Sequence, residues 1–174
     1  MNDLMLNING LTKQYKKFSF GPVDVRIEPG TVTALVGPNG SGKSTFFKLL
    51  MNLIQPDNGT ILCFGENMQD KEEEIKQEIG YASGDLFHIF GYLTIKELAN
   101  LVSYWYPNWD HQWFDHLMDR YEIDPSEKYA RCSTGMQKKV DFIFSIVHHP
   151  KRLLLDEPSA SVDMMSQKKM NEDL

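Results

Sequence analysis

The sequence has few cysteines, no long apolar run and no concentration of positive charge. Its two cysteines, Cys63 and Cys132, show neither the spacing of a metal site nor a disulfide framework, which is typical of a reducing compartment. No apolar stretch approaches the length of a membrane span, and the N-terminus lacks the pattern of a signal peptide. The formal net charge is −6 and no basic stripe is visible, so we expect no nucleic-acid partner.

What the sequence does contain is the composition of a folded domain. Its 174 residues are 41% hydrophobic, which is enough for one α/β domain with a sizeable core.

The most informative segment is Gly37–Ser44, which satisfies the pattern G-x-x-x-x-G-K-[ST]. We expect a buried strand over Thr31–Val36 before it. After it we expect a helix over Ser44–Ile54, with apolar residues at positions 46, 47, 50, 53 and 54 on one face. Glycines let successive backbone N–H groups converge on phosphate oxygens, and a helix N-terminus adds partial positive charge. The predicted phosphate-binding residues are Gly37, Pro38, Asn39, Gly40, Ser41, Gly42, Lys43, Ser44 and Thr45.

Two side chains of this loop have predicted chemical roles. Lys43 supplies a point charge for the β and γ phosphates, where it assists catalysis. Ser44 supplies a hydroxyl for Mg²⁺, which prefers oxygen ligands.

A second element of the same site is the apolar run Arg152–Leu155, which ends in two carboxylates. We expect a buried strand there, because ligands of open α/β sheets bind beyond the carboxyl ends of strands. Asp156 is then placed to hold Mg²⁺, and Glu157 to orient or deprotonate the attacking water.

These residues resemble the nucleotide-binding domain of the ATP-binding cassette (ABC) ATPases over nearly the whole chain. The segment Cys132–Met136 is similar to the family's LSGGQ signature, with only Ser133 and Gly135 keeping their identity. A helix follows in the pattern, with Val140, Ile143, Phe144 and Val147 on one face. The resemblance implies that Ser133 and Gly135 bind the γ-phosphate of ATP held by the other subunit of a dimer.

The resemblance implies two further roles. Tyr15 matches the aromatic residue that stacks on adenine, although a core or hairpin tyrosine is the alternative. Ser159–Asp163 resembles the D-loop, which lies at the dimer interface.

The sequence also departs from the family. Gly84 falls where the family places a glutamine that touches Mg²⁺, and Asp85 can substitute as a metal ligand or be a solvated turn residue. The family's switch histidine follows the D-loop on a later strand, and no such strand follows before Leu174. We therefore expect that this form is truncated and hydrolyses ATP slowly.

The predicted domain organisation is a core interrupted by a helical insertion. Residues 1–70 and 138–174 form the ATP-binding core, incomplete at its C-terminus, and residues 71–137 form a helical subdomain with the signature at its end. Within the insertion we expect a helix over Lys71–Ile79 with Ile75 and Ile79 inward, a capping box at Thr94–Glu97, and a helix capped by Asp110. The aromatic run Tyr104–Trp109 is either core or a partner-docking surface, and we favour core.

The predicted fold is α/β: a P-loop NTPase core with a mostly parallel sheet flanked by helices, an N-terminal antiparallel β part and the inserted helical subdomain. The resemblance implies an ATP-hydrolysing subunit, using ATP and Mg²⁺, that powers an ABC transporter with separate transmembrane permease subunits. It would pair with itself or a paralogous ATPase subunit in an ATP sandwich, and lie in the cytoplasm against the inner face of the membrane. The alternatives are a soluble non-transport ABC-type ATPase and a catalytically degenerate ATP-binding regulatory module.

Overall fold

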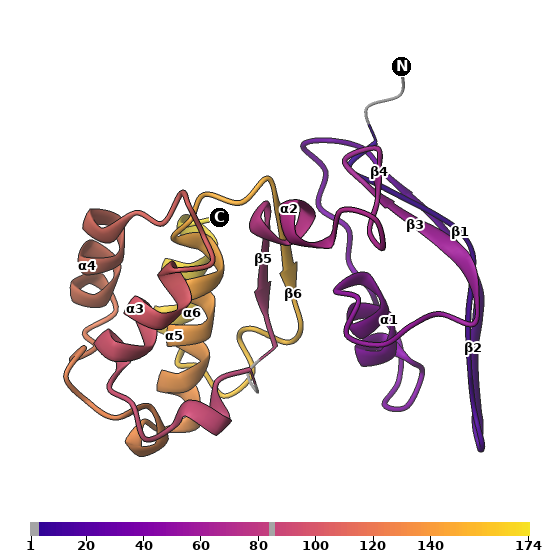
Figure 1. Ribbon diagram of the computed structural model, residues 1–174. Coiled ribbons are helices and arrows are strands. Elements are labelled where there is room, and N and C mark those ends of the chain that lie inside the picture. Colours follow the sequence, from indigo (N-terminus) through magenta and orange to yellow (C-terminus); the bar gives the residue numbers. More distant parts are fainter. Residues whose placement is uncertain (1–3, 84–85) are drawn as a thin grey trace. The chain divides into compact units, whose positions relative to one another are not determined.

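The computed structural model describes residues 4–83 and 86–174 (Figure 1). By its contacts the chain divides into two compact units, one ending at Lys76 and one beginning at Gln77. Each unit is described by itself.

The first unit is built on a four-stranded antiparallel sheet in the order β2-β1-β3-β4. The strands are β1 (Leu6–Tyr15), β2 (Phe18–Ile27), β3 (Asn58–Cys63) and β4 (Glu66–Asn67). Successive side chains of β1 point to opposite faces of the sheet, so Leu6 and Ile8 are buried on the same face. A register shift between Ile8 and Leu11 allows Leu11, an odd number of positions further on, to be buried as well. Gly10 makes that irregularity possible, because its φ of 56° lies in the left-handed region.

Helix α1 (Lys43–Leu50) packs on this sheet through aromatic and aliphatic side chains. The ring of Phe46 lies 6.2 Å from that of Phe20 on β2, and Leu49 and Leu50 are buried. The helix is shorter than the expected Ser44–Ile54, and Leu53 beyond its end is 53% exposed. The predicted apolar face was therefore wrong at that end, because the chain turns away before residue 53 can reach the core.

The expected strand at Thr31–Val36 is also wrong. These residues have no regular secondary structure, and Val32 and Val36 are 102% and 89% exposed. An extended segment becomes a strand only through hydrogen bonds to a neighbouring strand. Thr31–Val36 pairs with no strand of the four-stranded sheet or of the β5–β6 pair, so no ladder of hydrogen bonds forms along it in the described part of the chain.

Helix α2 (Glu72–Gln77) closes the first unit with Ile75 buried, as predicted. Ile79 is also buried, but it belongs to strand β5 (Ile79–Ala82) rather than to the helix. The predicted helix was therefore too long, by one residue at its start and two at its end. A single buried isoleucine fits a helix face and a buried strand equally well.

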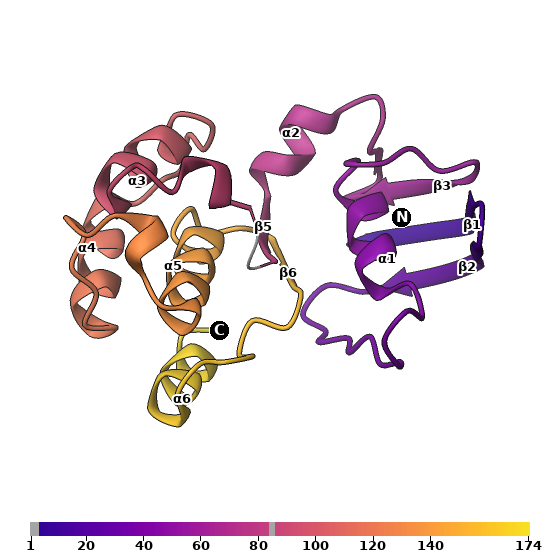
Figure 2. The same cartoon turned by 90° about the horizontal axis from the view of Figure 1, so that it is seen from below.

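The second unit places a two-stranded parallel sheet beside a group of helices (Figures 1 and 2). Strand β5 pairs with β6 (Arg152–Leu155), Ile79 opposite Arg152 and Ala82 opposite Leu155. Helix α5 (Thr134–Ile146) packs tightly on β5, because a Cβ atom on Gly80 would lie 1.9 Å from the carbonyl oxygen of Ser145. The strand predicted at Arg152–Leu155 is confirmed, with Leu154 as its buried residue.

Helix α5 carries the core of this unit. The predicted face is confirmed, since Val140, Ile143, Phe144 and Val147 are all buried. Around it lie α3 (Ile95–Ser103), α4 (His111–Arg120), α6 (Met164–Glu172) and the 3₁₀ turns η1 (His88–Phe90) and η2 (Tyr129–Arg131).

The predicted caps of α3 and α4 are confirmed. Thr94 accepts a hydrogen bond from the backbone N–H of Glu97, and the Glu97 carboxylate accepts one from the N–H of Thr94. Asp110 accepts a hydrogen bond from the N–H of Trp113 at 2.8 Å. Both helices thus begin where the sequence predicts.

The aromatic run Tyr104–Trp109 divides into two parts. Trp109 is buried and Tyr106 is half-buried against His148, which confirms the core interpretation for these two. Tyr104 and Trp105 are 83% and 62% exposed, so that interpretation was wrong for them. Helix α3 ends at Ser103, and the turn that follows points these two rings outward.

The architecture confirms the predicted fold class of an α/β protein with an antiparallel N-terminal part, a parallel sheet and helices. The proposed insertion at residues 71–137 stays a prediction.

Candidate functional site

The phosphate loop, Gly37–Ser44, wraps around the start of α1. Gly42 is the N-cap of the helix with a φ of 98°, and it offers no side-chain cap to the first N–H groups. A Cβ atom at this position would also lie 2.7 Å from the ring of Phe20. Glycine is therefore required twice, for its conformation and for its size, and the helix N-terminus is left open to an anion.

Lys43 folds back over the loop rather than into solvent. Its Nζ atom donates to the carbonyl oxygen of Gly37 at 2.8 Å and to that of Pro38 at 3.2 Å. The ammonium group is thus held at the loop that the sequence predicts to contact phosphate. The hydroxyl-bearing Ser44 is exposed in the first turn of α1, and Thr45 after it is half-buried.

Tyr15 lies at the end of β1, in the hairpin that leads to β2. It is 44% exposed, and its ring stacks on that of Phe18 with centroids 6.2 Å apart. This exposure is compatible with contact to a base, while the stacking on Phe18 also fits the alternative of a hairpin tyrosine. Its adenine contact stays a prediction.

Asp156 and Glu157 follow the carboxyl end of β6. The N–H of Asp156 donates to the carbonyl oxygen of Ala82 at 2.9 Å, so the parallel ladder extends to the first carboxylate. Asp156 is half-buried, and Glu157 is exposed with a φ of 52°. Left-handed backbone at a non-glycine residue is uncommon.

Ser133 and Gly135 stand at the start of α5. Ser133 is its N-cap and accepts a hydrogen bond from the N–H of Met136. A Cβ atom on Gly135 would lie 2.5 Å from the carbonyl oxygen of Ser161, so the helix start packs directly on the segment after β6. Burial raises the pKa of the Cys132 thiol, which precedes them.

A pocket with a volume of about 470 Å³ opens at this helix start. Its lining combines signature residues with residues of the segment after β6, and we call it the signature pocket: Ser133, Thr134, Gly135, Met136, Lys139, Ser161 and Asp163. Lys139 is the cationic member, with its Nζ atom 3.9 Å from a carboxylate oxygen of Asp163. The sequence predicted roles for Ser133 and Gly135 and placed Ser161 and Asp163 in the D-loop, but it assigned no role to Lys139.

The predicted site residues fall in both units. The phosphate loop and Tyr15 belong to the unit that ends at Lys76, and Asp156, Glu157, Ser133 and Gly135 belong to the unit that begins at Gln77. Gly84 and Asp85 lie outside the described residues.

Mg²⁺ binding rests on the chemistry of the donors. Ser44 and Asp156 offer a hydroxyl and a carboxylate, which are oxygen ligands of the kind that Mg²⁺ prefers. Over residues 4–83 and 86–174, no three His, Cys, Asp or Glu side chains gather as a metal cluster. Each of the two side chains, taken by itself, is a suitable donor for Mg²⁺.

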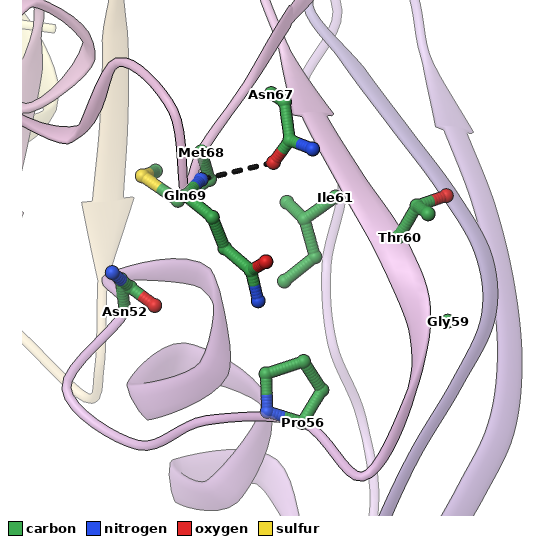
Figure 3. A pocket seen from close by; sticks show the side chains of 8 residues that line it. All are labelled: Asn52, Pro56, Gly59, Thr60, Ile61, Asn67, Met68 and Gln69. Carbon is green, nitrogen blue, oxygen red and sulfur yellow. Dashed lines mark hydrogen bonds between the residues drawn. The ribbon is translucent and has the colours of Figure 1, made fainter.

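A second, much smaller pocket lies in the first unit (Figure 3). Its volume is about 30 Å³, close to that of one water molecule, and Asn52, Asn67 and Gln69 contribute amide groups to its lining. The side chain of Asn67 accepts a hydrogen bond from the N–H of Gln69 at 2.9 Å (Figure 3). The pocket is too small for a nucleotide.

The phosphate loop before α1, the antiparallel part and the parallel pair β5–β6 together define a P-loop nucleotide-binding protein of the cassette type. A family model described as "ABC transporter" matches residues 20–160, and the chain belongs to this family.

Individual relatives are also ABC transporter proteins. The chain is 35% identical over 145 residues to the ABC transporter ATP-binding protein YtrB of Bacillus subtilis, a match that covers 83% of this chain and 49% of YtrB. It is 32% identical to the probable multidrug ABC transporter ATP-binding protein YbhF of Escherichia coli, covering 98% of this chain and 31% of YbhF. The chain thus spans about half or less of the length of these two relatives.

Solved structures show the same fold. An ATP-binding subunit of an ABC transporter superposes with a TM-score of 0.84 at 25% identity, covering 97% of this chain and 72% of that one. The dimeric structure of MJ0796, a bacterial ABC transporter cassette, gives a TM-score of 0.82 at 21% identity. The match covers 97% of this chain and 81% of the MJ0796 chain. Among the described residues, no helix has both the length and the apolar character needed to cross a membrane.

Proposed function

We propose that this chain binds Mg·ATP and hydrolyses ATP to power a transporter whose membrane-spanning permease subunits are other polypeptides. The observation that carries the proposal is the phosphate loop, with the open N-terminus of α1 and the Lys43 ammonium held at its carbonyl groups. Both features offer positive charge to the same anion.

Nucleotide binding is tested by calorimetric titration of Lys43→Ala with Mg·ATP. Losing a charged contact of this kind removes about 1.5–3 kcal/mol, so the dissociation constant should rise about 10- to 150-fold. Lys48→Ala is the matched control, because Lys48 is an exposed lysine of the same helix. An affinity that is unchanged in Lys43→Ala would contradict the role of Lys43.

For hydrolysis we propose that Glu157 accepts a proton from the attacking water. The water oxygen then bonds to the γ-phosphorus, the bond from that phosphorus to the bridging oxygen breaks, and ADP and phosphate leave. Lys43 stabilises charge on the γ-phosphate, and Ser44 and Asp156, with Asp85 as a further candidate, would hold Mg²⁺. When bound, Mg²⁺ neutralises charge on the β and γ phosphate oxygens.

Two chains would sandwich ATP, with Ser133 and Gly135 of each chain completing the partner's site. Support comes from the open signature pocket and from the dimeric form of the structural relative MJ0796. Glu157→Gln should lengthen the lifetime of the dimer, because bound ATP is not consumed. Light scattering that shows only monomer for this variant at saturating Mg·ATP would refute the sandwich.

The permease partner and a place on the inner face of the membrane are supported by relatives whose names describe ATP-binding proteins of transporters. Co-expression with a candidate multi-helix permease, followed by co-purification from membranes, tests this. Recovery only in the fraction without membranes would favour a non-transport ATPase.

A second candidate is an ATP-binding regulatory module that does not hydrolyse. It is favoured by Thr134 and Met136 in the signature and by Gly84 in place of the family's glutamine. The same departures support slow turnover by these 174 residues. Phosphate release no faster than that of Glu157→Gln would favour this candidate.

A further inference from the structure

The candidate general base is tied through its backbone to the helix that begins at the signature. The Nζ atom of Lys138 on α5 donates to the carbonyl oxygen of Glu157 at 2.7 Å. The same oxygen accepts the N–H of Ala160 at 3.2 Å, closing a turn. Both acceptor positions of this carbonyl are therefore used.

This carbonyl belongs to a residue with an unusual backbone. Glu157 has a φ of 52°, a region that non-glycine residues enter only when the surrounding structure holds them there. The charged hydrogen bond from Lys138 is a contact of the stronger kind, because its donor carries a full positive charge.

We propose that Lys138 is a positioning residue for Glu157. Its ammonium holds the Glu157 backbone in the left-handed conformation and so sets the direction in which the carboxylate points. The inference rests on the role of Glu157 given under the proposed function. Lys138 itself needs no contact with nucleotide.

The surroundings of Lys138 support a dedicated contact. Among the described residues, no carboxylate lies within ion-pair distance of Lys138, whereas the adjacent Lys139 pairs with Asp163. The charge of Lys138 is thus used on a backbone carbonyl. Because Gly135 packs on Ser161 a turn earlier, the start of α5 holds the segment 156–163 at several points, and Lys138 holds it nearest to Glu157.

Hydrogen exchange tests the contact without requiring turnover. Lys138→Met keeps much of the length of the side chain but cannot donate. The Ala160 amide should exchange about tenfold faster in this variant, because the turn at Glu157 is no longer held. Lys138→Arg, which can still donate, should restore protection. Lys168→Met is the control, since Lys168 is a 75% exposed lysine on α6. Equal exchange in Lys138→Met and in the unaltered protein would overturn the proposal.

Kinetics separate positioning from a general structural role. In Lys138→Met, kcat for phosphate release should fall about tenfold or more, while KM and the dissociation constant for Mg·ATP stay within about twofold. Lys138→Arg should recover kcat. A raised KM with unchanged kcat would overturn the proposal. If Glu157→Gln releases phosphate as fast as the unaltered chain, the general-base role fails instead, and hydrogen exchange alone decides whether Lys138 holds the Glu157 backbone.

Discussion

Replacing Gly135 by alanine sets two effects of opposite sign against each other. In a helix, alanine is more favourable than glycine by about 1 kcal/mol, so propensity alone predicts that Gly135→Ala stabilises α5. The structure predicts the reverse. The new Cβ atom would lie 2.5 Å from the carbonyl oxygen of Ser161, whereas ordinary contact begins at 3.4 Å.

The magnitude follows from what has to move. The obstructing atom belongs to the backbone, so no side-chain rotation relieves the clash, and overpacking of this kind costs about 1–3 kcal/mol. After subtracting the helix propensity, Gly135→Ala should lower the free energy of unfolding by up to about 2 kcal/mol.

Urea unfolding followed by tryptophan fluorescence measures this effect in the right part of the chain. All three tryptophans, Trp105, Trp109 and Trp113, lie in the unit that begins at Gln77. Thr134→Ala is the matched control, because Thr134 is exposed at the first position of the same helix and its change should stay within about 0.5 kcal/mol. A Gly135→Ala protein that is more stable than the unaltered one, as helix propensity alone predicts, would show that the signature helix does not pack tightly on Ser161.

Three further outcomes are expected from the same unit. Gly80→Ala should destabilise it more than Gly135→Ala does, because its Cβ atom would lie 1.9 Å from the Ser145 carbonyl oxygen, and urea unfolding of both variants compares them. Thr94→Ala should cost about 1 kcal/mol in the same assay through loss of the α3 cap, and Thr94→Ser should restore most of it. Burial lowers the pKa of the His148 imidazole in the folded protein. As the pH falls, His148 is therefore protonated in the unfolded chain before it is protonated in the folded protein. The unfolding free energy should therefore decrease from about pH 8 to about pH 5.5, and His148→Gln should show a weaker decrease.

The features that sequence predicted well are those decided by neighbouring residues. The capping box joins Thr94 to Glu97, three positions apart, and Asp110 reaches Trp113 at the same spacing. The phosphate loop is one contiguous segment, in which Lys43 reaches the carbonyl groups of Gly37 and Pro38 a few positions away, and its contact with phosphate stays a prediction.

Predictions of strands and of buried side chains depended on packing and pairing partners that a local sequence pattern does not identify. Thr31–Val36 is apolar enough for a buried strand, yet burial requires a neighbour to supply hydrogen bonds and cover, and the sheet of the first unit supplies neither. Tyr104 and Trp105 are as apolar as Trp109, and only the direction of the turn after α3 separates exposed rings from a buried one.

The candidate site likewise combines features set by residue type with features set by distant contacts. The sequence predicts Glu157 as a general base, but this role depends on where the backbone points the carboxylate, and the φ of 52° is not encoded by glutamate. That conformation is held from 19 positions away by Lys138. In the sequence Lys138 and Lys139 form an ordinary pair of charges, whereas the fold gives one to a backbone carbonyl and the other to the Asp163 carboxylate. Residue identity therefore specifies the chemistry available to this site, and long-range contacts decide which of two adjacent lysines bears on it.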